Sequence, residues 1–156
     1  QRDHIFRGVT RGRAPLFSDS AIIGVPYNTD DPQHRNELTM GRLSTHVLDT
    51  ANGQPAAGMR IDFLERSGGH YILIKTLHTN ADGRTDEPVL KDTEMRTGEF
   101  ELSFHVADYF RRRGTTLTKP PFIDQVPVRF GIPDPSAHYH VPLLCTPWSY
   151  STYRGS

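Results

Sequence analysis

From Leu43 onward the chain is built of short segments with strand-like alternation, separated by Gly, Pro, Asn and Asp. A two-residue period places successive side chains on opposite faces of a sheet, so this rhythm is typical of all-β domains. Turn sequences stand at Asn52-Gly53, Ser67-Gly68-Gly69 and Asp82-Gly83. The predicted strands are residues 43–49, 59–66, 70–78, 87–90, 98–105, 126–132, 138–146 and 149–154. Eight strands of this kind predict an all-β, two-sheet sandwich.

One helix and one arm complete the predicted organisation. In residues 106–114, Val106, Tyr109 and Phe110 follow helical spacing and Gly114 follows them, which predicts a short helix. A chain of 156 residues suits a single domain. Residues 1–42 contain scattered Gly, Pro and Asp without a sustained period. We therefore expect an N-terminal arm, extended or loosely packed, before a domain over residues 43–156.

The amino-acid composition limits the kinds of binding partner that the chain can have. The 18 basic and 18 acidic side chains cancel, and no long run of one sign occurs, which argues against nucleic acid and anionic membranes. No apolar run is long enough to span a membrane. The single cysteine, Cys145, excludes an internal disulfide and a cysteine-based zinc cluster, and we expect it to be buried. The partner is therefore a small molecule or another copy of the chain. Gln1 in first position slightly favours a periplasmic over a cytoplasmic location.

Alternation divides two of the strands into a core face and a mixed face. The core set is Leu43, Thr45, Val47, Tyr139, Val141, Leu143 and Cys145. The mixed set is Ser44, His46, Leu48, His138, His140, Pro142 and Leu144. A face that combines imidazole with apolar groups is too apolar for water and too polar for a core, so we expect a ligand or a subunit to cover it.

The segment 150–156 is polar and follows an apolar strand directly. It brings Tyr153, Arg154 and Ser156 together, which supplies donors, acceptors and charge for a small polar ligand. By alternation Ser151 and Tyr153 share one face, while Thr152 and Arg154 share the other. We therefore expect a structural role for Arg154, such as hydrogen bonds to neighbouring carbonyls.

Four segments in this order resemble the 5-hydroxyisourate hydrolases, a transthyretin-related family. They are Leu-Ser-Thr-His-Val-Leu-Asp at 43–49, Asp-Gly-Arg at 82–84, His-Tyr-His-Val-Pro-Leu-Leu at 138–144 and Tyr-Ser-Thr-Tyr-Arg-Gly-Ser at 150–156. The resemblance covers residue 43 to the end and implies an eight-stranded transthyretin-like sandwich. It also implies hydrolysis of 5-hydroxyisourate to 2-oxo-4-hydroxy-4-carboxy-5-ureidoimidazoline in urate degradation.

The resemblance further implies where the chemistry takes place. It assigns catalysis to His46, Arg84, His140 and Ser156, and substrate contacts to His46, Arg84 and Tyr153. It implies no metal or organic cofactor. Members of the family are homotetramers, dimers of dimers, with sites at the dimer-dimer interface.

These residue types suit the reaction. Hydrolysis needs a base near the attacking water and a cation or donor near the carbonyl oxygen that gains negative charge. Histidine is largely neutral at physiological pH and can act as the base, whereas Arg84 keeps its charge and presents planar donors. The residues alone do not decide between His46 and His140 as the base. We expect Ser156 to hold one of these imidazoles.

Two alternatives compete with this reading. A transthyretin-like carrier would bind a small aromatic ligand without converting it, but the carrier lacks the terminal Tyr-Arg-Gly-Ser and the histidines at these positions. A metal site could use His46 and His140 from different strands, yet no suitably placed carboxylate accompanies them. The hydrolase is therefore favoured.

Overall fold

The structure is a computed structural model and describes residues 41–155. Its strands are β1 (Arg42–Ser44), β2 (Val47–Asp49), β3 (Gln54–Pro55), β4 (Arg60–Ser67), β5 (His70–His78), β6 (Leu90–Lys91), β7 (Gly98–Phe104), β8 (Val126–Ile132), β9 (His138–His140), β10 (Leu143–Cys145) and β11 (Tyr150–Thr152). A 3-10 turn, η1 (Asp92–Glu94), and a helix, α2 (Val106–Arg112), complete the elements. The predicted all-β sandwich with one short helix is confirmed, and every predicted strand overlaps an observed one. Of the predicted arm, residues 1–40 lie outside the described residues, and Arg42 belongs to β1.

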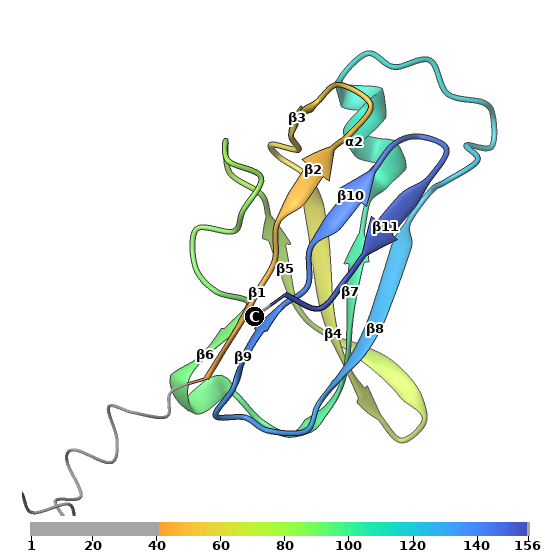
Figure 1. Ribbon diagram of the computed structural model, residues 1–156. Helices are drawn as coiled ribbons and strands as arrows, with labels where there is room; N and C mark the ends of the chain where they lie inside the picture. The colour runs from red at the N-terminus through yellow and green to blue at the C-terminus, as the bar shows by residue number, and fades with distance from the viewer. Residues whose placement is uncertain (1–40, 156) are drawn as a thin grey trace, which may run out of the picture.

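The strands form two layers (Figure 1). One layer is the antiparallel sheet β5-β4-β7-β8. The other contains the groups β6-β1-β9 and β11-β10-β2-β3. These groups continue one another, because Ser44 pairs with His140 before the junction and Val47 with Leu143 after it, in the same parallel register. The layer is therefore one sheet with a local interruption.

The interruption lies at residues 45–46 and 141–142 and splits two of the predicted strands. The Val141 N–H still donates to the Ser44 carbonyl at 3.0 Å, and the Leu143 N–H to the His46 carbonyl at 2.8 Å. The Val141 carbonyl, however, accepts from the Thr45 hydroxyl at 2.8 Å, so a side chain replaces a backbone donor. Alternation alone does not reveal this exchange.

The core fills the space between the layers. Its largest members come from β4, β7 and α2, including Phe63, Phe100, Phe104, Tyr109 and Phe110. The predicted core set of the two interrupted strands is confirmed, since all seven side chains are buried. Pro142, which we placed on the mixed face, is buried instead. Its carbonyl accepts from the Thr152 hydroxyl at 2.7 Å, which holds Pro142 next to β11.

Buried Asp49 at the end of β2 joins the helix to the sheet. Its carboxylate accepts from the Tyr109 hydroxyl of α2 at 3.0 Å and from the Asn52 side chain at 2.7 Å. Burial, with the Asp49 charge, raises the pKa of Tyr109 to about 12. A buried carboxylate is tolerated because it is hydrogen-bonded. The contact holds α2 at one end of the sandwich, away from the interruption (Figure 1).

Candidate active site

A tight turn after β5 places Arg84 beside His46. Residues His46 and Arg84 form an isolated antiparallel bridge, and the Val47 N–H donates to the Gly83 carbonyl at 2.8 Å. Gly83 has φ +73°, and a Cβ there would lie 2.4 Å from the Val47 carbonyl oxygen. Only glycine fits both constraints. The close contact of Gly83 with Val47 therefore fixes the position of the Arg84 backbone.

Asn80 stabilises the same turn through hydrogen bonds, a role that was not predicted from the sequence. Its side-chain oxygen accepts from the N–H groups of Asp82 at 3.0 Å and Arg84 at 3.2 Å. Its own N–H donates to the Arg84 carbonyl at 2.7 Å. This is the local bonding that asparagine supplies in turns, and an Asn two residues before an Asp-Gly pair is the signal that could have revealed it.

His140 lies at the end of β9, next to Ser44 on the neighbouring strand. The Ser44 hydroxyl oxygen is 2.9 Å from Nδ1 of His140. A cavity of about 250 Å³ opens beside them and is lined by Arg42, Ser44, Arg84, His138, Tyr139 and His140. A second cavity of about 220 Å³ shares Arg42, Ser44 and Arg84 with it. The space between β1, β9 and the Arg84 turn is thus hollow, polar and rich in cations.

The pKa values of His46 and His140 are both lowered, which favours their neutral forms. Partial burial lowers the pKa of His46 below its ordinary 6.5, and the charge of Arg84 lowers it further. For His140 the causes are the same, and the charges of His46 and Arg42 add to them. Hydrogen bonding to the backbone of Asp82 and of Ser44, respectively, opposes these effects in part. At neutral pH the site therefore holds neutral imidazoles next to exposed arginines, a base and a cation in one place.

The chain end returns to this site. Gly155 pairs with His140, donating its N–H to the His140 carbonyl at 2.8 Å. A Cβ on Gly155 would come within 3.0 Å of Cδ2 of the imidazole, so the backbone passes against the ring. Ser156, which we assigned to the catalytic set, lies outside the described residues.

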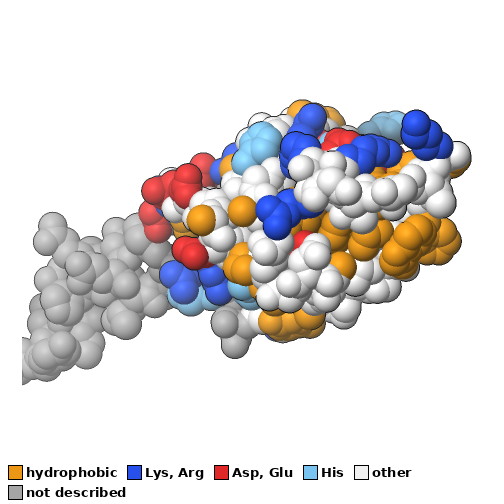
Figure 2. Space-filling model, turned by 90° about the horizontal axis from the view of Figure 1, so that it is seen from above, with side chains coloured by type: hydrophobic (Ala, Val, Ile, Leu, Met, Phe, Trp, Pro, Cys, Tyr) orange, Lys and Arg blue, Asp and Glu red, His pale blue; other side chains and the backbone are white. Residues whose placement is uncertain are grey.

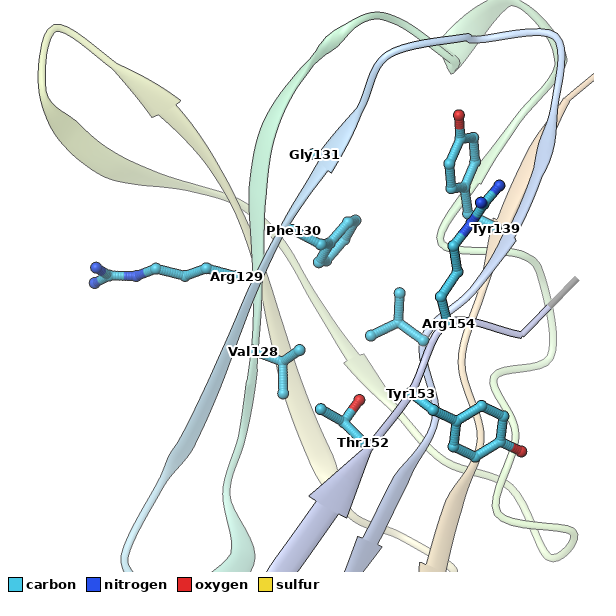
Figure 3. Close-up of a pocket in the computed structure, with 9 residues that line it drawn as sticks. Val128, Arg129, Phe130, Gly131, Tyr139, Thr152, Tyr153 and Arg154 are labelled. Atoms are coloured by element: carbon cyan, nitrogen blue, oxygen red, sulfur yellow. The ribbon is translucent and has the colours of Figure 1, made fainter.

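Tyr153 and Arg154 line a different cavity. It measures about 230 Å³, lies between β8 and β11, and is walled mainly by Val128, Phe130, Tyr139, Val141 and Thr152. In Figure 3 the Arg154 side chain reaches toward Tyr139, while the Tyr153 ring points away from Val128 and Phe130. The Arg154 guanidinium stands 5.1 Å from the centre of the Tyr139 ring, a cation–π contact. Within residues 41–155 the Arg154 guanidinium does not make the expected hydrogen bonds to carbonyls, and a structural role for it stays a prediction.

The family model described as HIUase/Transthyretin family matches residues 43–155. The chain belongs to this family. A 5-hydroxyisourate hydrolase 2 of Rhizobium meliloti (strain 1021) is 55% identical over 116 residues, 74% of this chain and 97% of that protein. A 5-hydroxyisourate hydrolase of Pseudomonas aeruginosa is 53% identical over 117 residues, 75% of this chain and 93% of that protein.

Solved structures agree with membership of the HIUase/Transthyretin family. The crystal structure of (S)-allantoin synthase has a TM-score of 0.71 and 47% identity, and the match covers 76% of this chain and 44% of that one. Sea bream transthyretin in complex with thyroxine has a TM-score of 0.65 and 26% identity, covering 73% of this chain and 94% of that one. The predicted transthyretin-like sandwich is confirmed by these matches.

Of the predicted site residues, the structure brings His46, Arg84 and His140 together and leaves Tyr153 at the other cavity. It adds Arg42 and Ser44, which the sequence reading had not assigned. Among residues 41–155 no group of three or more His, Cys, Asp or Glu is placed to hold a metal ion. No helix in that range is long and apolar enough to cross a membrane.

Proposed function

We propose that this protein hydrolyses 5-hydroxyisourate to 2-oxo-4-hydroxy-4-carboxy-5-ureidoimidazoline, a step in urate degradation. The family and the relatives named 5-hydroxyisourate hydrolase support the substrate. The observation that carries the proposal is the meeting of His46, Arg84 and His140, each from a distant part of the sequence, with both imidazole pKa values lowered. A neutral base beside a permanent cation is what hydrolysis of a cyclic amide needs.

In the proposed mechanism a neutral histidine takes a proton from water as the oxygen attacks a ring carbonyl carbon. Negative charge builds on the carbonyl oxygen, and the Arg84 guanidinium stabilises it with planar donors. The carbon–nitrogen bond of the ring then breaks, and the nitrogen receives the proton held by the histidine. The product is a carboxylate, whose charge is also complementary to Arg84.

The remaining assignments belong to the same proposal. Ser156 follows Gly155, which pairs with His140, and we assign it to the catalytic set on that ground together with the family resemblance. We assign Tyr153 to substrate contact across a subunit boundary, since in its own chain it lines the other cavity and not the one beside His140. This requires at least a second copy of the chain, and with the family resemblance we propose a homotetramer, a dimer of dimers, in which one chain completes the site of another.

Exposed aromatic side chains support such an assembly. Figure 2 shows hydrophobic side chains gathered on one side of the molecule. Phe122 is 73% exposed and Trp148 55% exposed, and their ring centres are 6.4 Å apart. Exposed aromatic clusters of this kind are typical of contact surfaces between proteins.

The direct test is the decay of 5-hydroxyisourate, generated from urate by urate oxidase and followed by absorbance. Wild type should accelerate the decay, and His46→Ala, His140→Ala and Arg84→Ala should each reduce the acceleration by about 10²- to 10³-fold. His70→Ala is the matched control, because this exposed histidine of β5 pairs with Ser67 of β4, whereas His46 pairs with Arg84. A chain truncated after Thr152 tests the terminal residues together.

A folded wild type that leaves the spontaneous decay unchanged would contradict the enzyme proposal. The transthyretin-like carrier would then be the reading to pursue, by a screen for small aromatic ligands. Equal activity of wild type and Arg84→Ala would contradict the assigned role of the guanidinium while leaving the reaction in place.

A further inference from the structure

Ser44 occupies a position from which it can control the protonation of His140. The two residues face one another in the parallel pairing of β1 and β9. Ser44 is half-buried, and its hydroxyl oxygen lies 2.9 Å from Nδ1 of the imidazole. The same hydroxyl lies 3.4 Å from the Tyr139 carbonyl oxygen, to which it can donate.

Because the Ser44 hydroxyl has a single proton, two hydrogen-bond arrangements with His140 are possible. Serine has one O–H and two acceptor lone pairs, and a neutral imidazole carries one proton on one of its two nitrogens. If the hydroxyl donates to the Tyr139 carbonyl, it accepts from Nδ1–H, and Nε2 keeps a free lone pair. If the hydroxyl donates to Nδ1, the proton lies on Nε2 and that nitrogen cannot accept another.

The surroundings favour the first arrangement. The Tyr139 carbonyl oxygen is within reach of the hydroxyl as an acceptor, so the hydroxyl proton has a partner other than the ring. The Ser44 hydroxyl oxygen then has lone pairs free to accept from Nδ1–H. On the Cδ2 side the Gly155 backbone passes so closely that a Cβ would lie 3.0 Å from the ring. The imidazole is held between these neighbours and has little freedom to flip.

We propose that Ser44 is a positioning residue, which accepts a hydrogen bond from Nδ1–H of His140 and so leaves Nε2 of that histidine to receive the proton from the attacking water. This inference rests on the proposed hydrolase function. It names His140 rather than His46 as the general base. It also gives a hydroxyl of β1, instead of a carboxylate, the task of fixing the tautomer.

The decisive measurement is the ¹⁵N chemical shift of His140 in histidine-labelled protein without substrate, assigned by the signals that His140→Ala removes. Wild type should show the Nδ1–H tautomer. Ser44→Ala should show a mixture of tautomers and a kcat lowered on the order of tenfold, the effect of one lost hydrogen bond, with little change in KM. Ser44→Thr keeps the hydroxyl and should restore both the tautomer and most of kcat. Ser67→Ala, at an exposed position of β4, is the control and should change neither.

The possible outcomes distinguish a failure of the Ser44 inference from a failure of the proposed hydrolase function. An active wild type with the Nε2–H tautomer, or Ser44→Ala with unchanged tautomer and kcat, overturns the role of Ser44 and leaves the hydrolase intact. A wild type that does not accelerate the decay of 5-hydroxyisourate overturns the function, and with it the task of His140, whatever its tautomer.

Discussion

At the level of single residues, the site depends on a shared charge. Arg84 stands beside both His46 and His140, and its charge lowers the pKa of each imidazole after burial has already done so. The guanidinium therefore has two effects. In the proposed mechanism it stabilises negative charge on the substrate, and it keeps the neighbouring base unprotonated.

The second effect can be measured on its own. In wild type, NMR titration should give His46 and His140 pKa values below 6.5, and the acid limb of the activity profile should follow them. Arg84→Gln should raise both pKa values, because the positive neighbour is lost, and should shift that limb to higher pH. Arg66→Gln removes an exposed arginine of β4 and serves as the control. Unchanged histidine titrations in Arg84→Gln would show that the charge does not act on the bases.

At the level of elements, the site forms where regular pairing stops. The strands themselves followed from alternation, and so did the faces of Leu43, Val47 and Leu143. The interruption at residues 45–46 did not, because it arises from a hydroxyl, that of Thr45, which takes the place of a backbone donor. The turn at Asp82-Gly83 could be predicted from the sequence. Its contact with Val47 could not, because it joins residues that are distant in sequence and come together only in the folded chain.

The same limit applies to the site residues. The family motifs predicted a site of His46, Arg84 and His140, and the structure places these three residues near one another. Ser44 belongs to one of those motifs, yet only the parallel register reveals that it faces His140. The position of Tyr153 depends on contacts beyond the single chain, which alternation along one strand cannot supply.

Gly83→Ala tests the contact that fixes Arg84. Its Cβ would lie 2.4 Å from the Val47 carbonyl oxygen at φ +73°, so both the turn and the edge of β2 must shift. We expect a loss of about 3 kcal/mol or more in unfolding free energy, the upper end for a strained position, together with reduced activity. Gly53→Ala is the matched control, because Gly53 has φ +64° and nothing within 4 Å. That variant should lose only about 1–2 kcal/mol. Denaturant unfolding measures both, and equal losses would mean that the close approach is unimportant.

At the level of the whole molecule, the aromatic cluster of Phe122 and Trp148 should lie in a subunit interface. Sedimentation velocity should find wild type at four times the chain mass of 17.6 kDa. Phe122→Asp should yield smaller species and lower activity, because a buried charge opposes association and the shared site is lost. Ile72→Asp is the control. Ile72 is 53% exposed and lies on β5, the edge strand of the sheet β5-β4-β7-β8. A monomeric but fully active wild type would contradict the proposal that subunits share the site.

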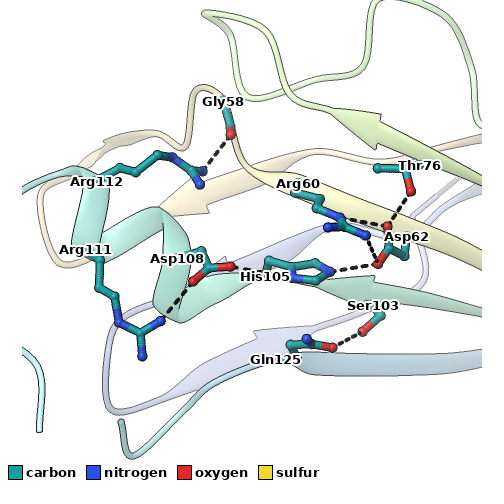
Figure 4. Close-up of polar contacts among 10 residues, drawn as sticks. All are labelled: Gly58, Arg60, Asp62, Thr76, Ser103, His105, Asp108, Arg111, Arg112 and Gln125. Atoms are coloured by element: carbon teal, nitrogen blue, oxygen red, sulfur yellow. Dashed lines mark hydrogen bonds and ion pairs between the residues drawn. The ribbon is translucent and has the colours of Figure 1, made fainter. Parts of the chain in front are cut away.

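The acid stability of the molecule should depend on Asp62, which ties three elements together. Its carboxylate accepts hydrogen bonds from Arg60 of its own strand, from Thr76 of β5 at 2.7 Å and from His105 at the start of α2 at 2.8 Å (Figure 4). Burial would raise its pKa, but the hydrogen bonds outweigh burial and lower it from 3.8 to about 2.

A folded pKa below the unfolded one means that the stabilisation is complete above about pH 4 and is lost as the pH falls through about 2. Asp62→Asn should therefore lower the unfolding free energy at neutral pH by about 1–3 kcal/mol, and the difference from wild type should vanish near pH 2. Asp124→Asn, at an exposed carboxylate, should follow the wild-type curve. Denaturant unfolding at a series of pH values measures this. A constant difference between wild type and Asp62→Asn would assign the effect to shape and not to charge, since only an ionised carboxylate gives stability that titrates.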